Sequence, residues 1–466
     1  MTKSGWILVG TVGLALVMTS LLVATRALKP EPPPWTTRSS EALRAFERGL
    51  DSLAKYYGAE AAQHFARAVE LDRDFAVAKL QLLLTDGGSP QERERWFREL
   101  GEAEISQLSP REQFLIGYWR LRFSGNSAEG KALLDEYLAR YPKDPWALST
   151  DCGLEWEREA WDQAESCYRR LIAMHPNWVR AQNRLGLIAM ARGQFKDAEE
   201  HFRTYGYIAP DQAAPWDSLG QLLAVRGHYD EASEAYQKAV SIKDDYCSAR
   251  WHVAVLESLR RRFDTSETRL RELEAIGACG EFTTWGLVCS RRAWNAYSTG
   301  DLASARAYLD DECLESRGGF DFVAHRLALA AGDLDEAVRL ELALKDRLRE
   351  KREDGDVYVF YGNFLQATGK HLVAMRTWSE SGASGDRDGV KRACRLLREA
   401  DDTMLYWGID RAMFKLFNLR QLARCYDLTS QPDLAARARA DLDRVNPRYR
   451  AEYAVPELPG TGSLDR

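Results

Sequence analysis

The sequence predicts an all-α protein, an α-solenoid of antiparallel helix pairs behind a single N-terminal transmembrane helix. Three observations support this prediction. Apolar residues recur at helical spacing along most of the chain, and strand signals are nearly absent. Aromatic residues and prolines recur every 34 residues, and residues 6–25 carry no charge. The first two observations indicate repeated helix pairs, and the third indicates a membrane span.

The composition excludes one class of partner. The chain has 466 residues, 45% of them hydrophobic and 29% charged, with a formal net charge of -6. A nucleic-acid partner requires a concentrated basic surface, whereas positive and negative residues are interspersed here. We therefore expect no nucleic-acid binding.

The N-terminal segment has the length of a membrane span. Residues 6–25 form twenty uncharged positions, which as a helix cover about 30 Å. A cleaved secretory signal is the alternative, but the candidate cleavage site Thr25-Arg26-Ala27 contains an unfavourable arginine. We expect an uncleaved anchor over residues 1–28, and Lys3 before the span places the rest of the chain outside the cytoplasm. A proline-rich spacer over 29–40 follows, with Pro30, Pro32, Pro33 and Pro34.

The repeat has a period of 34 residues. Two sets of positions show it independently: Trp161, Phe195, Tyr229 and Phe263, and Pro142, Pro176 and Pro210. Each interval contains two amphipathic helical stretches separated by a glycine or polar turn. In the unit 179–212 the first stripe is Gln182, Leu185, Gly186 and Ala189, and the second is Ala198, Phe202 and Tyr205.

This pattern resembles the tetratricopeptide repeat, whose unit has Leu-Gly, then Gly-x-Tyr, Ala, an aromatic residue and Pro at these offsets. The next unit matches it as well, with Leu219, Gly220, Gly227, Tyr229, Ala232 and Tyr236. The resemblance implies about ten helix pairs between residues 41 and 447. The anchor followed by repeats also resembles the recognition region of bacterial transmembrane proteins of this kind. It implies a single-pass protein of a bacterial inner membrane with an extracytoplasmic array.

The expected organisation follows from how closely each part fits the repeat. Its parts are the anchor 1–28, the spacer 29–40, divergent N-terminal helices over 41–110, a core array over 111–280, looser units over 281–380, a connecting segment over 381–410, a terminal unit over 411–450 and a tail over 451–466.

Eight cysteines lack the paired spacing of a zinc site. Cys152 and Cys167 fall on the two helices of one unit and are one possible disulfide; Cys279 with Cys289 or Cys313 is another. The alternative is that Cys152 occupies the small-residue position that Gly186 fills in the next unit. We expect this packing role for Cys152, and no metal site.

Catalytic motifs are missing from the sequence. It has no His-Glu-x-x-His, no Gly-x-Ser-x-Gly, no phosphate loop and no kinase catalytic run. We expect neither an enzyme nor a cofactor.

The resemblance also implies where a partner binds. In the family, peptides contact the first helix of each unit at offsets that packing does not use. These offsets, which are rich in tryptophan and arginine here, give the candidate groove residues Trp119, Trp146, Trp156, Arg180, Asn183, Arg184, Asp217, Gln221, Trp251, Trp294 and Tyr297. The lysine and asparagine of a carboxylate clamp do not occur at the required offsets.

The sequence thus predicts a membrane-anchored scaffold or adaptor that binds another protein or peptide in a bacterial envelope. One alternative is a recognition or regulatory subunit of a signalling kinase or of a transport or secretion system. Another is a glycan-acting enzyme, which a tryptophan-lined groove would permit.

Overall fold

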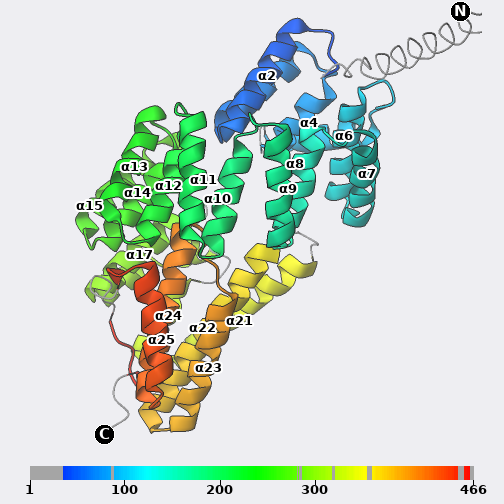
Figure 1. The fold of residues 1–466 in the computed structure, drawn as a ribbon. Coiled ribbons are helices and arrows are strands. Elements are labelled where there is room, and N and C mark those ends of the chain that lie inside the picture. Colours follow the sequence, from blue (N-terminus) through cyan, green and yellow to red (C-terminus); the bar gives the residue numbers. More distant parts are fainter. Residues whose placement is uncertain are drawn as a thin grey trace, which may run out of the picture. The chain divides into compact units, whose positions relative to one another are not determined.

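The structure is a computed structural model that describes residues 35–85, 89–280, 282, 286–316, 321–353, 359–449 and 456–461. Throughout this part of the chain the regular elements are helices, arranged mainly as antiparallel pairs (Figure 1). The predicted all-α solenoid is therefore confirmed. The chain divides into two compact units, one of residues 1–51 and 58–136, the other of residues 52–57 and 137–466.

The first unit begins with a helix pair that follows the repeat. Its helices are α2 (Ser40–Ala54), whose last residues belong to the second unit, α3 (Gly58–Leu71), α4 (Ala76–Leu84), α5 (Pro90–Glu102), α6 (Pro110–Phe123) and α7 (Ser127–Arg140). Gly49 on α2 faces the ring of Phe65 on α3 so closely that an added Cβ would lie 2.4 Å from it. Phe65 is fully buried, so this glycine is required for the two backbones to approach.

The second unit starts with four regular helix pairs. They are α8 (Pro145–Glu157) with α9 (Trp161–Met174), α10 (Arg180–Ala191) with α11 (Phe195–Ile208), α12 (Ala214–Val225) with α13 (Tyr229–Ile242), and α14 (Cys247–Leu259) with α15 (Phe263–Glu274). The close approach seen at Gly49 recurs in two of them. An added Cβ on Gly186 would meet the Phe202 ring at 2.4 Å, and one on Gly220 would meet the Tyr236 ring at 2.5 Å.

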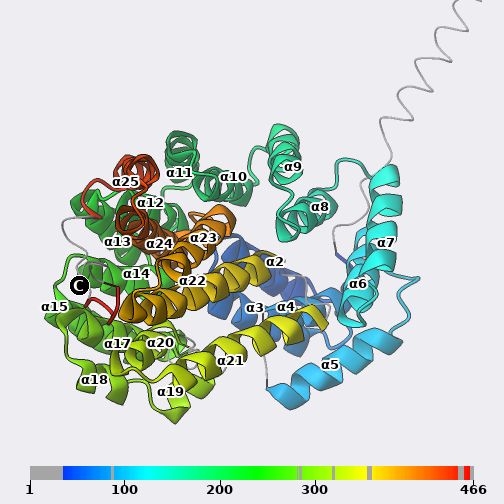
Figure 2. The same cartoon turned by 90° about the horizontal axis from the view of Figure 1, so that it is seen from below.

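The remaining helices of the second unit depart from the 34-residue rhythm. They are the 3-10 helix η1 (Gly277–Cys279), α17 (Leu287–Thr299), α18 (Leu302–Ala307), α19 (Asp311–Ser316), α20 (Phe322–Ala331), α21 (Leu334–Glu353), α22 (Val359–Ser384), α23 (Arg387–Thr403), α24 (Gly408–Leu428) and α25 (Pro432–Val445). Helix α24 returns to pack on α12, and one apolar core joins residues of α12, α13, α14 and α24 (Figure 2).

The expected connecting segment over 381–410 has a different structure from the one we expected. It contains the end of α22, all of α23 and the start of α24. Val390, Ala393 and Leu397 on α23 are fully buried, and together they form an apolar helix face. The glycines and serines near residue 381 suggested a loop, but burial of this apolar face stabilises a helix instead.

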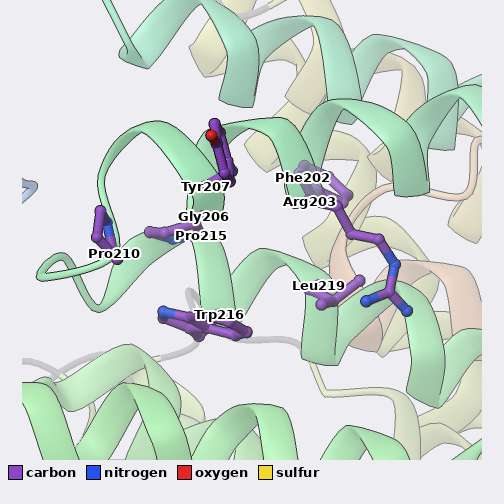
Figure 3. A pocket seen from close by; sticks show the side chains of 8 residues that line it. All are labelled: Phe202, Arg203, Gly206, Tyr207, Pro210, Pro215, Trp216 and Leu219. Atoms are coloured by element: carbon purple, nitrogen blue, oxygen red, sulfur yellow. The ribbon is translucent and has the colours of Figure 1, made fainter.

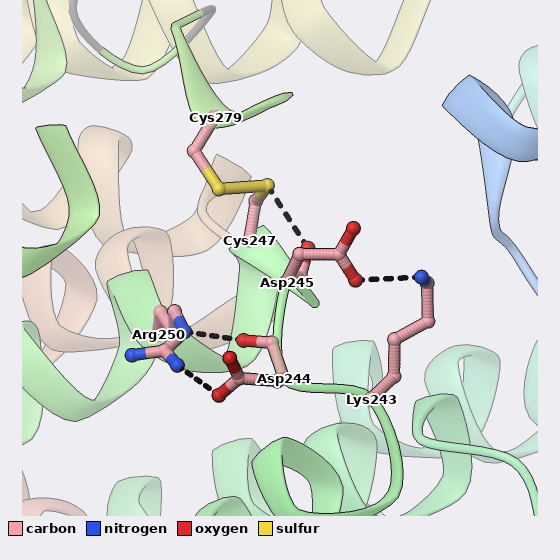
Figure 4. Close-up of a disulfide and its surroundings, with 6 residues drawn as sticks. All are labelled: Lys243, Asp244, Asp245, Cys247, Arg250 and Cys279. Atoms are coloured by element: carbon pink, nitrogen blue, oxygen red, sulfur yellow. Dashed lines mark hydrogen bonds and ion pairs between the residues drawn. A yellow bond between two sulfur atoms is a disulfide. The ribbon is translucent and has the colours of Figure 1, made fainter. Parts of the chain in front are cut away.

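All eight cysteines are paired. The disulfides are Cys152–Cys167, Cys247–Cys279, Cys289–Cys313 and Cys394–Cys425. Cys152 is thus a disulfide partner as well as a buried small residue, and the suggested pairing of Cys279 with Cys289 or Cys313 is wrong. Figure 4 shows that Cys279 in η1 lies over Cys247 at the start of α14. Cys289 lies on α17 and pairs with Cys313 on α19.

The described helices include none that is both long and apolar enough to cross a membrane. We therefore correct the expected localisation: this finding contradicts a single-pass protein of the bacterial inner membrane, and it does not support a membrane partner. The expected span, residues 6–25, lies outside the described residues.

Candidate protein-binding face of the helix pairs

Ten of the eleven candidate residues lie on helices of the second unit. Helix α8 carries Trp146 and Trp156, α10 carries Arg180, Asn183 and Arg184, α12 carries Asp217 and Gln221, α14 carries Trp251, and α17 carries Trp294 and Tyr297. Trp119 lies on α6 in the first unit, half-buried against Tyr118 and Phe123. Ten candidate residues therefore belong to one compact unit, and Trp119 belongs to the other.

A basic cluster surrounds Tyr56, which belongs to the second unit although it precedes α3. The Arg180 guanidinium lies 4.4 Å from the centre of the Tyr56 ring. Asn183 donates a hydrogen bond to the Tyr56 hydroxyl at 3.2 Å and accepts one from Ser218 at 2.8 Å. Burial acts to raise the pKa of Tyr56, but the charges of Arg180 and Arg184 and the bond from Asn183 outweigh it, so this pKa is lowered. The cluster thus stabilises negative charge at the position of the Tyr56 hydroxyl.

Arg184 extends this cluster toward a group of tryptophans. Its guanidinium lies 4.6 Å from the centre of the Trp156 ring, a cation–π contact. The Trp156 ring also packs against Trp161 at 5.8 Å, Trp407 at 4.6 Å and Tyr168 at 6.4 Å between ring centres. Because Trp407 directly precedes α24, the C-terminal part of the chain covers this candidate residue.

Trp146 lies near the start of α10. Its ring packs edge-on against Trp178, at 5.5 Å between centres, two residues before Arg180. Both Trp146 and Arg180 are half-buried and expose part of their surface. They occupy the same offset in consecutive units, 34 residues apart.

A buried acid–histidine pair joins α12 to α14. His252 donates a hydrogen bond from Nδ1 to Asp217 Oδ1 at 2.6 Å, and Gln221 donates to the other oxygen of Asp217 at 3.2 Å. Burial acts to lower the pKa of His252, but the charge and hydrogen bond of Asp217 outweigh it, with a smaller contribution from Asp410, and the pKa is raised. Asp217, only 4% exposed, therefore serves the contact between the two helices.

Trp251 is held by the C-terminal helix. Its indole nitrogen donates to Asp410 on α24 at 3.2 Å, and Asp410 also pairs with Arg291 on α17 at 2.5 Å. The Arg291 guanidinium lies 5.7 Å from the centre of the Trp251 ring. Trp251 is 4% exposed, so this packing leaves little of it for a partner.

Trp294 and Tyr297 on α17 are also engaged within the chain. The Trp294 ring packs edge-on against Phe417 of α24 at 6.1 Å, and Tyr297 is fully buried. The Tyr297 hydroxyl accepts a hydrogen bond from Arg326 at 3.0 Å and donates one to the carbonyl of Pro456 at 3.3 Å. Both residues hold the C-terminal segment in place.

The sequence reasoning missed Tyr56, Trp407 and Asp410, which complete this face. They come from residues 52–57 and 404–410, outside the first helices of the repeats. The 34-residue register gives no signal for them because they contact the repeats from distant parts of the chain, as in the Trp251–Asp410 bond over 159 residues.

The cluster around Arg180 and Arg184 combines positive charge with aromatic rings. Arginine and tryptophan bury large areas at interfaces, and guanidinium groups bind carboxylates with two parallel hydrogen bonds. Among the residues that the structure describes, no group of three His, Cys, Asp or Glu side chains could hold a metal ion. The exposed parts of Arg180, Arg184 and Trp146 are suited to binding an acidic segment.

The fold defines a class, the proteins built from repeated antiparallel helix pairs. Residues 213–246, which span α12 and α13, match the tetratricopeptide repeat. This match and the solenoid of helix pairs support a tetratricopeptide repeat protein, and proteins of this kind are in general non-catalytic scaffolds. No curated protein matches the chain.

Several solved structures align with parts of the chain. A tetratricopeptide repeat protein from Parabacteroides merdae is 16% identical and aligns over 55% of this chain and 97% of its own, with a TM-score of 0.42. The type IV pilus biogenesis factor PilW is 12% identical over 46% of this chain and 96% of its own, with a TM-score of 0.38. The APC/C hetero-tetramer Cut9-Hcn1 gives 12% identity over 87% of this chain and 74% of that chain, with a TM-score of 0.49.

Proposed function

We propose that this protein is a scaffold that binds an acidic segment of a partner protein on the surface formed by Trp146, Arg180 and Arg184. The observation that carries the proposal is the basic cluster on α10, where Arg180 and Arg184 are four residues apart on one helix and place their guanidinium groups over the rings of Tyr56 and Trp156, at 4.4 Å and 4.6 Å from the ring centres. Positive potential of this kind attracts carboxylates and orients them.

The other candidate residues have a supporting part in this proposal. Trp156, Asp217, Trp251, Trp294 and Tyr297 contact other parts of the chain and keep the first helices in register. Asn183 orients Tyr56, and Gln221 orients Asp217. The partner thus contacts the half-buried residues at the α8 and α10 end. The role of Trp119, in the first unit, stays a prediction.

Site-specific photocrosslinking tests the proposal. A photoreactive phenylalanine analogue replaces Arg184 in the full chain expressed in its native cells, and the same analogue replaces the exposed Lys196 on α11 as the control. We expect a defined protein adduct from position 184 and none from position 196, and we expect Arg180→Glu to abolish it. Equal adducts from both positions, or an adduct that Arg180→Glu leaves unchanged, would refute the proposal.

A further inference from the structure

A pocket between α11 and α12 lies apart from the surface just described. Its volume is about 510 Å³ and its lining consists of Phe202, Arg203, Gly206, Tyr207, Pro210, Pro215, Trp216 and Leu219 (Figure 3). Asp217 and Gln221 of α12 face the His252 pair, whereas Trp216 and Leu219, three residues apart, lie on the side that faces α11. The two sides of α12 are therefore separate surfaces.

The pocket exists because one side chain is missing from the repeat. Gly206 occupies the offset that holds Ile172 in the preceding unit and Val240 in the following one. Both of those side chains are partly buried and pack against neighbouring core residues. A Cβ added to Gly206 would lie 3.7 Å from the Trp216 ring and 3.8 Å from Pro215, which is ordinary contact distance. Nothing in the packing of α11 against α12 therefore requires a glycine here.

The walls of the pocket are also specific to this unit. Tyr207 is 88% exposed, at an offset that holds Ala173 and Ser241 in the flanking units. Trp216 replaces Gln182 and Arg250 at its offset. Trp216, Pro210 and Pro215 give the pocket an apolar lining of rings, with the exposed Tyr207 at its edge, and such a lining is suited to proline rings.

The polar groups around the pocket indicate what a ligand must provide. Arg203 is the charged residue of the lining, and it carries donors only. A polyproline II segment has no internal hydrogen bonds, so its carbonyl groups are free to accept, and an acidic residue in it would complement Arg203.

We propose that this pocket binds an extended, proline-rich segment of a partner protein that carries an adjacent acidic residue. A helix would need a longer groove with contacts at i, i+3, i+4 and i+7, whereas this lining comes from the end of α11 and the start of α12. Arg203 now pairs with Glu199 at 2.8 Å, but the two side chains are 56% and 42% exposed, and a pair this accessible to solvent exchanges partners at little cost. The proposal rests on the scaffold function and adds a second contact surface to it.

The neighbouring repeat provides a matched control for Arg203. Arg169 stands 34 residues earlier and pairs with Glu165 at 2.6 Å in the same i,i+4 arrangement, and the two arginine side chains are similarly exposed, at 62% and 56%. Glu165 is less exposed than Glu199 and also pairs with Arg192. It does not line the pocket. A change in peptide binding that occurs with a substitution at Arg203 but not at Arg169 is therefore due to the pocket and not to the charge of the helix.

The experiment measures fluorescence anisotropy of two labelled peptides on the full chain, Ala-Pro-Pro-Glu-Pro-Pro-Ala and the same peptide with lysine in place of glutamate. We expect the glutamate peptide to bind, and Gly206→Ile, which fills the pocket with the side chain of Ile172, to weaken it at least about tenfold. Arg203→Glu should reverse the preference in favour of the lysine peptide, while Arg169→Glu should change nothing.

Three results would overturn the proposal. They are no binding of either peptide, unchanged binding to Gly206→Ile, and equal effects of Arg203→Glu and Arg169→Glu. Self-association of the wild-type chain that Gly206→Ile abolishes, measured by analytical ultracentrifugation, would also overturn it and assign the pocket to a second copy. Because neither Arg180 nor Arg184 is changed, failure here leaves the crosslinking test of the scaffold function independent.

Discussion

Helix α12 has two sides with different neighbours. On one side, helix α24 and the residue before it cover the first helices of the repeats through Trp407, Asp410 and Phe417. On the other side, Trp216 and Leu219 line an open pocket whose exposed tyrosine is absent from the flanking units. The same repeat pattern thus produces a covered face and an open one, and the difference depends on which distant segment returns to the repeat.

This comparison changes where binding is expected. Tetratricopeptide offsets assign partner contacts to the first helices, but at α12, α14 and α17 the chain's own residues already occupy several of those positions. Coverage by α24 leaves Trp146, Arg180 and Arg184 at one end of the face and the Gly206 pocket on the other side. The predictions below test first the covered face and then the open one.

The largest expected effect comes from shortening a buried side chain of α24, the helix that covers the repeats. Phe417 is 2% exposed on α24, and its ring packs against Trp294 and Phe322. Phe417→Ala should reduce the free energy of unfolding by about 3–5 kcal/mol, because a large cavity opens in a shared core. Urea unfolding followed by tryptophan fluorescence measures the change. Leu434→Ala on α25, where the side chain is 37% exposed, is the control and should change it by less than about 0.5 kcal/mol. Similar losses in both variants would mean that α24 is not an integral cover.

Removal of the disulfide that ties α24 to α23 should have the next largest effect. Cys394 and Cys425 are separated by 31 residues. The double variant Cys394→Ser, Cys425→Ser should lose about 2–4 kcal/mol of stability, because the unfolded chain regains the freedom of that loop. Unfolding with and without a reductant separates this bond from the other three: the reductant should still destabilise the double variant. A double variant as stable as the wild type would contradict the prediction.

These effects also show what the sequence could predict. The 34-residue register gave the pairs α8 to α15 because it reports contacts inside a pair and between consecutive pairs, such as Gly186 against Phe202. It could not give the return of α24, since the Trp251–Asp410 bond joins residues 159 positions apart and leaves no period. Because the register reports only contacts within and between consecutive pairs, it could predict the candidate residues on the first helices. It could not predict Tyr56 and Trp407, which contact those helices from distant parts of the chain.

Gly220 and Gly206 differ in how closely the chain packs around them. Gly220 on α12 has no room for a side chain, since a Cβ would lie 2.5 Å from the Tyr236 ring. Gly220→Ala should therefore destabilise the fold by about 1–3 kcal/mol. Gly206→Ala meets only ordinary contacts on α11 and should stabilise it by up to about 1 kcal/mol, because alanine favours the helix. Thermal unfolding of the two variants should move the midpoint in opposite directions, and shifts of the same sign would refute the packing difference.

Two histidines should give the smallest and most specific effects, with opposite pH dependences. His252 has a folded pKa above its unfolded value of about 6.5, so its contribution to stability is complete below that pH and is lost as the pH rises through the folded pKa. For His371, burial lowers the pKa to about 3, so its contribution is present above the unfolded pKa and is lost as the pH falls from about 6.5 toward 3.

Glutamine variants separate the two contributions. His252 donates to Asp217 and His371 donates to Asn418 at 2.8 Å, and glutamine keeps a donor without titrating. In urea unfolding between pH 5 and 8, His252→Gln should remove part of the loss of stability above pH about 6.5, and His371→Gln should remove part of the loss below it. Parallel pH profiles for both variants and the wild type would show that the Asp217 pair does not retain the proton, and that α12 and α14 are joined by a neutral hydrogen bond.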